Sequence, residues 1–564
     1  MKVRALVGLC RLGVHGGNDA SVKPLAEGST LVLAKACCRY LTNAKEAPGG
    51  KDDPRLWAAE GLAFLTLDAD VKEEFVSNTQ AIQALAELGK AGNVSAVYPV
   101  ATILVNMCNA YEQKKPEPEM IELAKFSKQH IPETHSKDTD EFIEKRIRKL
   151  AGTNIVSAIH ALEKVATLEQ SREQFARVLL AIVGITDLRG LVVAQGGTKT
   201  LLSLATGRDG SMMCRDLAAQ ALAKMAITQD PEIAFPGQRA LELVRPLLRL
   251  LHPENTSLQH FEALMALTNL TSSNMKARAL VVAEKGIPYI DSFTYDDHED
   301  VQRAACETMC NLVMTTDFDD DELEEDEEAL NKLTEDEKEK RAAEKKKRHP
   351  ACIWDMFRND FDRLKYWIML LGDEDPGLVL AISGGLAALT VDKTIARKAV
   401  EVTGWMDKIH ILLANEDARF QHRGVVIVRN LISAHRSIAE RIVMSPMLEI
   451  LTAISLLRHV QQEIGDPGQI HSRKVASEIA QECLEKLEEL GFVKKQKGGK
   501  APPVPFIQIP EEPEPKEEEV EKKKNEANKE VEKDKQKEEY YMPMPQATPG
   551  AITEITEVTE DLDN

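Results

Sequence analysis

Hydrophobic residues recur along most of the chain with the spacing of amphipathic helices, and one kind of helix always ends in the same way. A run of small and branched apolar residues closes on Thr or Asn. The eight segments with this ending are GLAFLT at Thr66, ATILVN at Asn106, AIVGIT at Thr186, AKMAIT at Thr228, ALTN at Asn269, ETMCN at Asn311, GLAALT at Thr390 and VIVRN at Asn430. Because no segment shows the period-two alternation of a β-strand, we predict an all-α fold.

These endings follow one another at a nearly constant interval. Thr186 and Thr228 are 42 residues apart, and Thr390 and Asn430 are 40 apart. Armadillo and HEAT repeats have periods of about 40 to 47 residues. A second amphipathic helix precedes each marked one, and such a pair carries too much apolar surface to be stable alone. The sequence therefore predicts an armadillo/HEAT-like superhelical solenoid of stacked helix pairs, with a row of side chains along its concave face.

Two intervals are about twice as long. The interval from Asn311 to Thr390 is 79 residues, and it contains the charged segment 317–351, whose removal leaves about one repeat. The interval from Asn106 to Thr186 is 80 residues, and we assign it one repeat with a long excursion. We predict that 317–351 is a disordered charged insert. The Lys/Glu/Pro-rich tail, residues 494–564, is also predicted to be disordered, because it has too little apolar surface to offset its ordering entropy.

Charge and cysteine usage narrow the class of protein. The formal net charge is -20, so the chain lacks the basic surface that nucleic-acid phosphates require. Apolar helical patterns contain Cys37, Cys38, Cys108, Cys214 and Cys352, as is typical of free thiols in a reducing compartment. No run of about 18 apolar residues is present. We expect a cytoplasmic protein without nucleic-acid or membrane partners. Since helical periodicity is already established at residue 3, the chain is expected to begin inside a domain.

The repeated polar endings are the strongest candidate for a binding site. An Asn amide can donate to a carbonyl and accept from an N–H at once, so a row of Asn side chains could hold the backbone of an extended polypeptide. We predict a groove for such a segment, the client. The groove residues are Asn106, Asn269, Asn311 and Asn430, with Thr186 and Thr228. The alternative is that these side chains merely cap the ends of their own helices.

Other patterns imitate known sites, and each lacks an essential part. The acidic run after residue 316 has the Asp spacing of a calcium loop, but Glu occupies the position that needs Gly. Cys306 and Cys310 with His298 lack a fourth metal ligand. The segment AQGGTK, residues 194–199, lacks the spacing of a phosphate loop. We predict a protein that is not an enzyme, with neither metal nor cofactor.

Several long stretches resemble one known family. They are GLAFLTLDADVKEEF at 61–75, ELAKFSKQHIPE at 122–133, VAQGGTKTL at 193–201, ITQDPEIAFPGQRALELVRPLLRLL at 227–251, FEALMALTNL at 261–270 and FQHRGVVIVRNL at 420–431. The chain is similar to the UCS domain of the animal myosin chaperones from residue 1 to about 316 and from about 352 to 493. Compared with the domain organisation of that family, residues 1–50 resemble the end of the central armadillo region, and residues 51–493 resemble the UCS domain.

The resemblance implies an armadillo-repeat chaperone that binds the motor domain of the myosin heavy chain while it folds and supports thick-filament assembly in muscle. In that family a tetratricopeptide domain recruits heat-shock protein 90. This chain has no counterpart of that domain, so the resemblance predicts a fragment, a short isoform or an incomplete gene product. The charged insert and the tail depart from the family pattern.

A scaffold or transport adaptor of the catenin or importin kind is the alternative function. An importin-like groove pairs its Asn row with regularly placed Trp residues. The four Trp residues here, at 57, 354, 367 and 405, do not accompany the Asn positions. This absence favours the chaperone.

Overall fold

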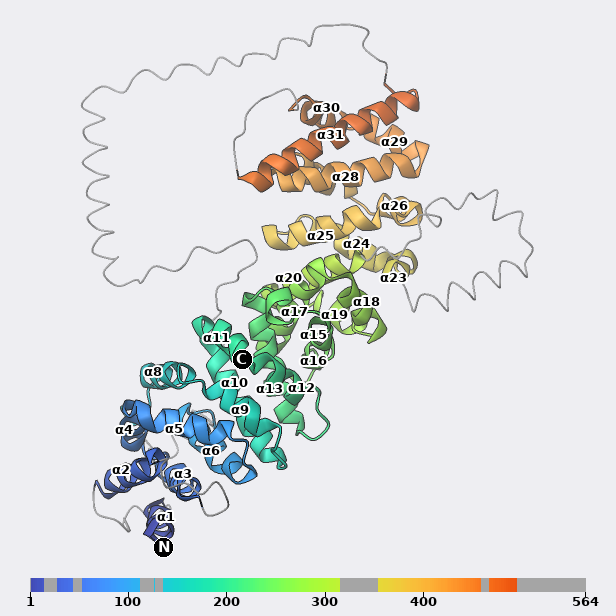
Figure 1. Ribbon diagram of the computed structural model, residues 1–564. Coiled ribbons are helices and arrows are strands. Elements are labelled where there is room, and N and C mark those ends of the chain that lie inside the picture. The colour runs from blue at the N-terminus through green and yellow to red at the C-terminus, as the bar shows by residue number, and fades with distance from the viewer. Residues whose placement is uncertain are drawn as a thin grey trace, which may run out of the picture. The chain divides into compact units, whose positions relative to one another are not determined.

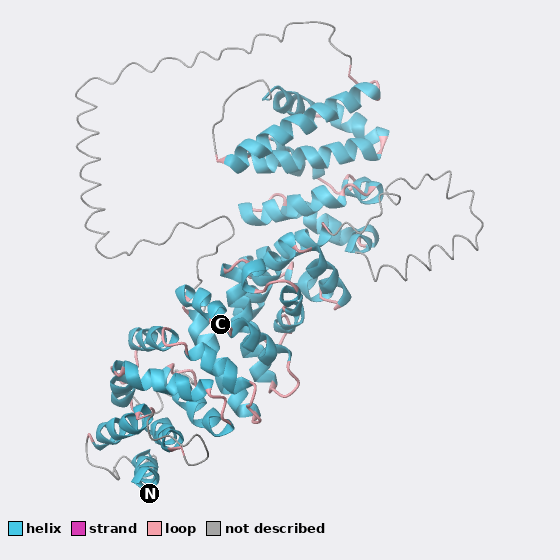
Figure 2. Cartoon of the chain, in the orientation of Figure 1, coloured by secondary structure: helices cyan, strands magenta, loops and turns pink. Residues whose placement is uncertain are grey.

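The computed structural model describes residues 2–14, 28–43, 53–111, 126, 135–314, 353–457 and 466–493. Within these ranges every regular element is helical, and none is a strand (Figures 1 and 2). Residues 1–487 form one compact unit. The charged insert at 317–351 and the tail at 494–564 lie outside the described residues. The prediction of an all-α, armadillo-like fold is confirmed.

The helices fall into three classes that alternate along the chain as the first, second and third helix of each repeat. The third helices are α1 (Lys2–Val14), α3 (Pro54–Leu65), α6 (Val94–Met107), α10 (Glu169–Gly184), α13 (Met212–Thr228), α17 (Ser257–Ser273), α20 (Glu299–Val313), α25 (Pro376–Leu389), α28 (Ala418–Ala434) and α31 (Pro467–Glu489). The second helices are α2 (Ser29–Thr42), α5 (Thr79–Lys90), α9 (Ile155–Glu163), α12 (Gly197–Thr206), α16 (Val244–Leu250), α19 (Ile287–Phe293), α24 (Phe361–Leu370), α27 (Trp405–Leu413) and α30 (Met447–Leu456).

The first helices are mostly short. They are α4 (Ala69–Ser77), α8 (Asp140–Ala151), α11 (Arg189–Ala194) after the 3-10 turn η2 (Thr186–Leu188), α14 (Pro231–Ala234) with α15 (Gln238–Glu242), α18 (Met275–Ala283), α23 (Ile353–Asn359), α26 (Lys393–Ala399) and α29 (Arg436–Val443). The prediction of helix pairs is therefore wrong, because every repeat after α3 in the described residues is a triplet. Apart from α8, which has 12 residues, the first helices have four to nine residues and span too few turns to show a helical period in the sequence.

The third helices pack against one another in chain order from α1 to α28 and form one continuous layer (Figure 1). Helices α6 and α10 are in direct contact, and so are α20 and α25. Each long interval in the sequence therefore contains a single repeat, as predicted. The end of the layer is closed by α31, where the Cys483 thiol lies 3.9 Å from the carbonyl oxygen of Val425 on α28.

Short polar residues fix where the helices begin. Asp53, Asp230 and Asp375 each accept a backbone N–H with the side chain and are followed by Pro at the first helical position. A capping box joins Thr256 and Gln259 at the start of α17. The candidate site lies at the opposite, carboxyl ends of the third helices.

Candidate functional site

The structure places the predicted site residues at the carboxyl ends of consecutive third helices. Thr66 follows α3, Asn106 lies in the last turn of α6, and Thr186 follows α10 after one residue. Thr228 ends α13, Asn269 and Asn311 lie near the ends of α17 and α20, and Thr390 and Asn430 lie at the ends of α25 and α28. We call these eight residues the ladder.

Each ladder Asn donates its Nδ2 to a backbone carbonyl oxygen of the preceding third helix, 43 residues earlier. The four pairs are Asn106 with Ala63 at 3.1 Å, Asn269 with Ala226 at 3.1 Å, Asn311 with Thr268 at 3.0 Å, and Asn430 with Ala387 at 3.0 Å. Ala63, Ala226 and Ala387 lie in the last turn of their helices, where carbonyls have no partner within the helix, so a side chain from the next repeat satisfies them well.

Nδ2 also reaches a second acceptor in each case. In three pairs it is a Thr hydroxyl 40 residues earlier: Thr66 for Asn106 at 3.0 Å, Thr271 for Asn311 at 3.4 Å, and Thr390 for Asn430 at 3.1 Å. Asn269 donates instead to the carbonyl of Ile227 at 3.0 Å. These Thr side chains are buried. One Asn therefore joins two repeats through both hydrogens of its amide.

This geometry changes the interpretation of the row. The sequence analysis predicted that both the N–H donors and the oxygen acceptor of each Asn amide bind the client. In the structure, Nδ2 of each amide donates to another part of the same chain. The alternative, capping of their own helices, is also incomplete, because the Asn side chains bind the helix before their own. No described residue donates to Oδ1 of Asn269, Asn311 or Asn430, and these oxygens are not enclosed. Binding of a client at the acceptor side stays a prediction.

The two Thr members of the predicted groove differ from the Asn residues. Thr228 is exposed, and its hydroxyl oxygen accepts from Arg189 Nη1 at 2.8 Å. Thr186 is exposed as the first residue of η2. Neither makes the bond to the preceding repeat that the Asn residues make. Both face solvent at the same ends of the third helices as the Asn residues.

Exposed apolar side chains follow the ladder. Leu67 comes directly after Thr66, Met314 lies three residues after Asn311, and Val391 comes directly after Thr390; their exposed fractions are 54%, 41% and 41%. We call these three residues the apolar row. Since it lies at the same helix ends as the ladder, an apolar contact and an amide oxygen are presented together.

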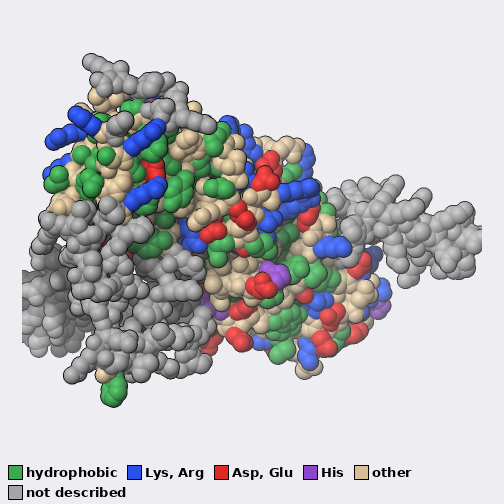
Figure 3. Space-filling view, turned by 90° about the horizontal axis from the view of Figure 1, so that it is seen from below, with side chains coloured by type: hydrophobic (Ala, Val, Ile, Leu, Met, Phe, Trp, Pro, Cys, Tyr) green, Lys and Arg blue, Asp and Glu red, His purple; other side chains and the backbone are tan. Residues whose placement is uncertain are grey.

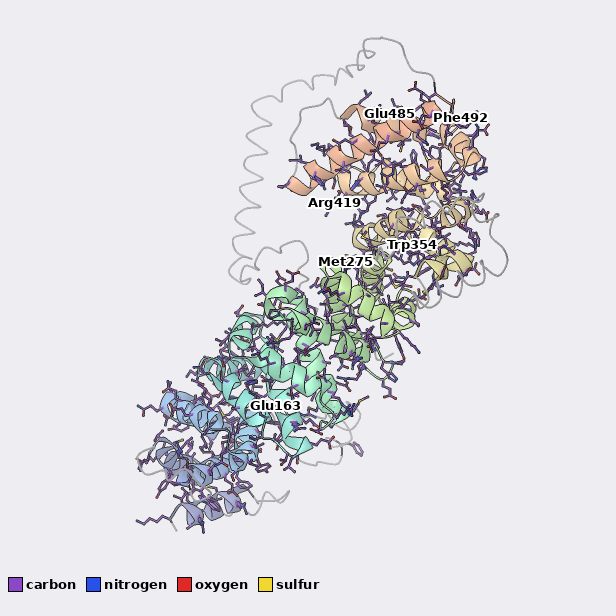
Figure 4. The ribbon with its side chains drawn as sticks, turned by 45° about the vertical axis from the view of Figure 1, so that its right-hand side comes forward. Glu163, Met275, Trp354, Arg419, Glu485 and Phe492 are labelled. Atoms are coloured by element: carbon purple, nitrogen blue, oxygen red, sulfur yellow. The ribbon has the colours of Figure 1, made fainter. Side chains whose placement is uncertain are left out.

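The first helices supply cations and one indole to the same helix ends. Arg146 Nε donates to the carbonyl of Met107 at 3.0 Å, and Arg189 Nε donates to Val183 at 2.8 Å. Trp354 on α23, labelled in Figure 4, donates Nε1 to the carbonyl of Val313 at 3.0 Å. A cation at the carboxyl end of a helix also opposes the helix dipole. Sequence reasoning missed these partners, because a single Arg per repeat does not stand out among the other charges.

Arg146 belongs to a buried ionic cluster that no sequence pattern indicated. Its side chain is 0% exposed and that of Lys72 is 1% exposed. Asp138 accepts from Lys72 Nζ at 3.0 Å and from Arg146 Nη2 at 2.9 Å. Burial raises the pKa of the Asp138 carboxyl, but the hydrogen bond and the charge of Lys72, with Arg146, outweigh it, so the pKa is lowered. The cluster joins α4 to α8.

A cleft of 620 Å³ lies at the other ends of the third helices. Among the residues that line it are Met212 and Met213, at the start of α13, and Tyr289 on α19. Helix α13 is 17 residues long, so the cleft is about 20 Å from the ladder residue Thr228. The cleft and the ladder are separate features.

The described residues contain no group of three or more His, Cys, Asp or Glu that could hold a metal ion. Burial raises the pKa of the Cys214 and Cys310 thiols to about 11, so they stay protonated at neutral pH and are poor nucleophiles. The segment AQGGTK forms a joint between helices, where Gly196 adopts φ +83° before α12 and Gln195 donates to Ala151 at 2.9 Å. No described helix is both long and apolar enough to cross a membrane.

Three Trp residues are core residues, not groove residues. Trp354, Trp367 and Trp405 are 5%, 0% and 3% exposed. Their burial leaves no regular Trp row beside the ladder in the part of the chain that the structure describes. This agrees with the sequence argument against an importin-like groove.

Comparisons with known proteins point to one group. The chain is 42% identical over 500 residues to protein unc-45 homolog B of Xenopus tropicalis. The matched region covers 88% of this chain and 48% of the relative. The structure of UNC-45 from Drosophila melanogaster is 40% identical, with a TM-score of 0.68, over 87% of this chain and 56% of that one.

A second solved structure gives the same result. The myosin chaperone UNC-45 from C. elegans, in complex with a Hsp90 peptide, is 31% identical with a TM-score of 0.65, over 85% of this chain and 45% of that one. No protein-family model matches the chain. The chain spans about half the length of the curated relatives it matches.

Proposed function

Because this chain belongs to the UNC-45 family, we propose that it is a myosin-directed chaperone without enzymatic activity, which holds the myosin motor head while the head folds. The C. elegans family member is a myosin chaperone. Its complex with a Hsp90 peptide supports heat-shock protein 90 as a partner of the longer family members. A myosin client would place the chain in the cytoplasm and, in muscle, beside the sarcomere during thick-filament assembly.

The carboxyl ends of the third helices support this proposal most directly. There the amide oxygens of Asn269, Asn311 and Asn430 have no donor among the described residues, and the apolar row lies beside the ladder. An extended client segment has backbone N–H groups that these oxygens can accept, whatever its side chains. Each such bond is worth only about 0.5 to 1.5 kcal/mol, so capture needs several together with apolar contact. Figure 3 shows one face of the molecule, on which hydrophobic side chains are interspersed with charged ones.

The proposed mechanism is holding, without consumption of nucleotide. A protein that binds the aggregation-prone form of a client lowers its free concentration by mass action. The client is released when its extended segments fold and withdraw from the ladder. On this view residues 51–493 form the client-binding domain and residues 1–50 the end of the preceding armadillo region.

Thermal aggregation of a myosin motor domain tests the function. With the full chain present and nucleotide absent, we expect the heated motor domain to scatter less light than it does alone. An unrelated heat-labile enzyme serves as the control client, and its scattering should fall less. Equal scattering of the motor domain with and without the chain would refute the proposal.

A further inference from the structure

Helix α28 is basic, although the whole chain has a net charge of -20. Its basic and titratable side chains are Arg419, His422, Arg423 and Arg429, and it contains no Asp or Glu. Arg419, labelled in Figure 4, pairs with Asp417 at 2.7 Å, and Arg429 lies 3.6 Å from Glu482. Arg423 lies between them in the sequence. It makes no hydrogen bond or ion pair with any described residue, and its Nη1 atom is enclosed without a partner.

The position of this guanidinium depends on a glycine in the neighbouring third helix. A Cβ atom added to Gly384 of α25 would lie 3.1 Å from Arg423 Nη1 and 3.0 Å from Cys310 Sγ. The Arg423 side chain therefore crosses α25 where that helix has no side chain and approaches α20. Burial lowers the pKa of the Arg423 guanidinium, which means that the charged form is desolvated.

Cations at other third-helix contacts have an acid on or near the adjacent third helix. Lys224 on α13 pairs with Glu262 on α17 at 2.6 Å, and Arg303 on α20 pairs at 3.1 Å with Asp375, the cap of α25. Opposite Arg423, α25 presents Gly384 instead. A desolvated charge without a counter-ion destabilises a fold, and so does an enclosed donor without an acceptor. The chain thus supplies no carboxylate to this guanidinium, whose Nη1 is enclosed and whose Nε and Nη2 are not.

We propose that Arg423 recognises an anion, namely the carboxylate of an Asp or Glu side chain in an extended client segment. This inference rests on the proposed function and gives the client a chemical preference. Leu380 and Ala388, one turn to either side of Gly384, are half-exposed and apolar, which suits a polypeptide better than a free inorganic anion. Asn430 is seven residues from Arg423 on α28, about 10 Å away, which is the length of three extended residues. A segment whose backbone binds at Asn430 can therefore place an acidic side chain at Arg423.

Peptide binding to the full chain tests the site. Two end-blocked, fluorescent, extended peptides differ only in a central Glu or Gln. The chain should bind the Glu peptide about tenfold more tightly, and Arg423→Gln should bind both alike. Arg419→Gln is the matched control, because it removes the same charge from the same helix one turn away, and it should keep the preference. A preference retained in Arg423→Gln, or absent from the unchanged chain, would overturn the proposal.

Two further measurements make the test independent of folding and of ligand source. Arg423→Met should raise the midpoint of thermal unfolding, because it removes an uncompensated charge; a lower midpoint would assign Arg423 a structural role and overturn the proposal. Millimolar inorganic phosphate should not displace the Glu peptide, and full displacement would refute a client carboxylate as the ligand. The peptide assay contains no myosin. If the unchanged chain shows no preference for the Glu peptide but still protects myosin from aggregation, this inference alone is refuted. If it prefers the Glu peptide but does not protect myosin, only the proposed function is refuted.

Discussion

Asn430 donates its Nδ2 to the carbonyl oxygen of Ala387 at 3.0 Å, across the contact between α28 and α25. Replacing Asn430 by Ala leaves this carbonyl with only the long bond from the Thr390 hydroxyl at 3.4 Å, and it leaves the buried Thr390 hydroxyl oxygen without a donor. We expect Asn430→Ala to lower the free energy of unfolding by about 1 to 3 kcal/mol, as loss of a buried hydrogen-bond partner usually does. Urea unfolding followed by helical circular dichroism measures the change.

Asn359→Ala is the control, because Asn359 is an exposed residue at the end of α23. It should change the free energy of unfolding by less than about 0.5 kcal/mol. If Asn430→Ala were equally neutral while capture of myosin fell, the ladder would serve the client alone and its assigned role between repeats would be wrong.

The buried cluster around Asp138 predicts an acid-sensitive fold. The pKa of Asp138 is lowered in the folded chain, whereas an Asp in the unfolded chain has a pKa of about 3.9. The unfolded chain therefore binds the proton more readily than the folded chain does. The stabilisation is therefore complete above about pH 5 and is lost as pH falls below about 4, through the lower folded pKa. Unfolding free energies measured across this range should decrease toward acid.

Asp138→Asn should be less stable at pH 7 by about 3 to 5 kcal/mol, because Lys72 then stays buried without its ion-pair partner, whereas Arg146 keeps Glu73 at 2.9 Å. It should also lose less stability on acidification than the unchanged chain. Asp355→Asn, whose carboxylate is 50% exposed and pairs with Arg358, is the control and should cost less than about 1 kcal/mol. If the unfolding free energy of Asp138→Asn fell with pH as steeply as that of the unchanged chain, the Asp138 carboxyl would not be the source of the acid sensitivity.

The sequence was sufficient for the third helices and for their order. Their long apolar runs have a clear period, and the endings at Thr228, Asn269 and Asn311 repeat once per structural unit. The first helices were missed because α14 and α26 have only four and seven residues. Such segments form because neighbouring repeats pack on them, so their own sequences carry little of the information.

The role of the ladder could not be settled from its spacing. A side chain that binds an extended client recurs once per repeat, and so does one that joins two repeats. Only the folded structure shows that Asn311 Nδ2 faces the Thr268 carbonyl, 43 residues earlier. Arg423 was missed for a related reason, since its lack of a partner depends on Gly384 in another helix.

Two Gly→Ala substitutions should have opposite effects on stability. A Cβ on Gly385 would lie 2.5 Å from Cζ3 of Trp367, which is fully buried and packs edge-on against Phe357 at 4.7 Å between ring centroids. We expect Gly385→Ala to cost about 1 to 3 kcal/mol through overpacking. Gly190 in α11 has open space at the same position, so Gly190→Ala should stabilise by about 0.5 to 1 kcal/mol. Thermal unfolding of both variants checks the signs, and a destabilised Gly190→Ala would contradict the helical environment of that residue.

The apolar row gives the sharpest separation of binding from stability. Met314 and Val391 are each 41% exposed, so replacing both by Ser removes little buried area from the fold. If a client covers these side chains, the double variant should bind a denatured myosin motor domain about tenfold more weakly, with an unchanged unfolding midpoint. Met369→Ser with Ile411→Ser is the matched control, because these side chains are 55% and 48% exposed but lie on the second helices α24 and α27. Equal weakening by both pairs would show that capture depends on general surface hydrophobicity, and the ends of the third helices would then lose their assigned role.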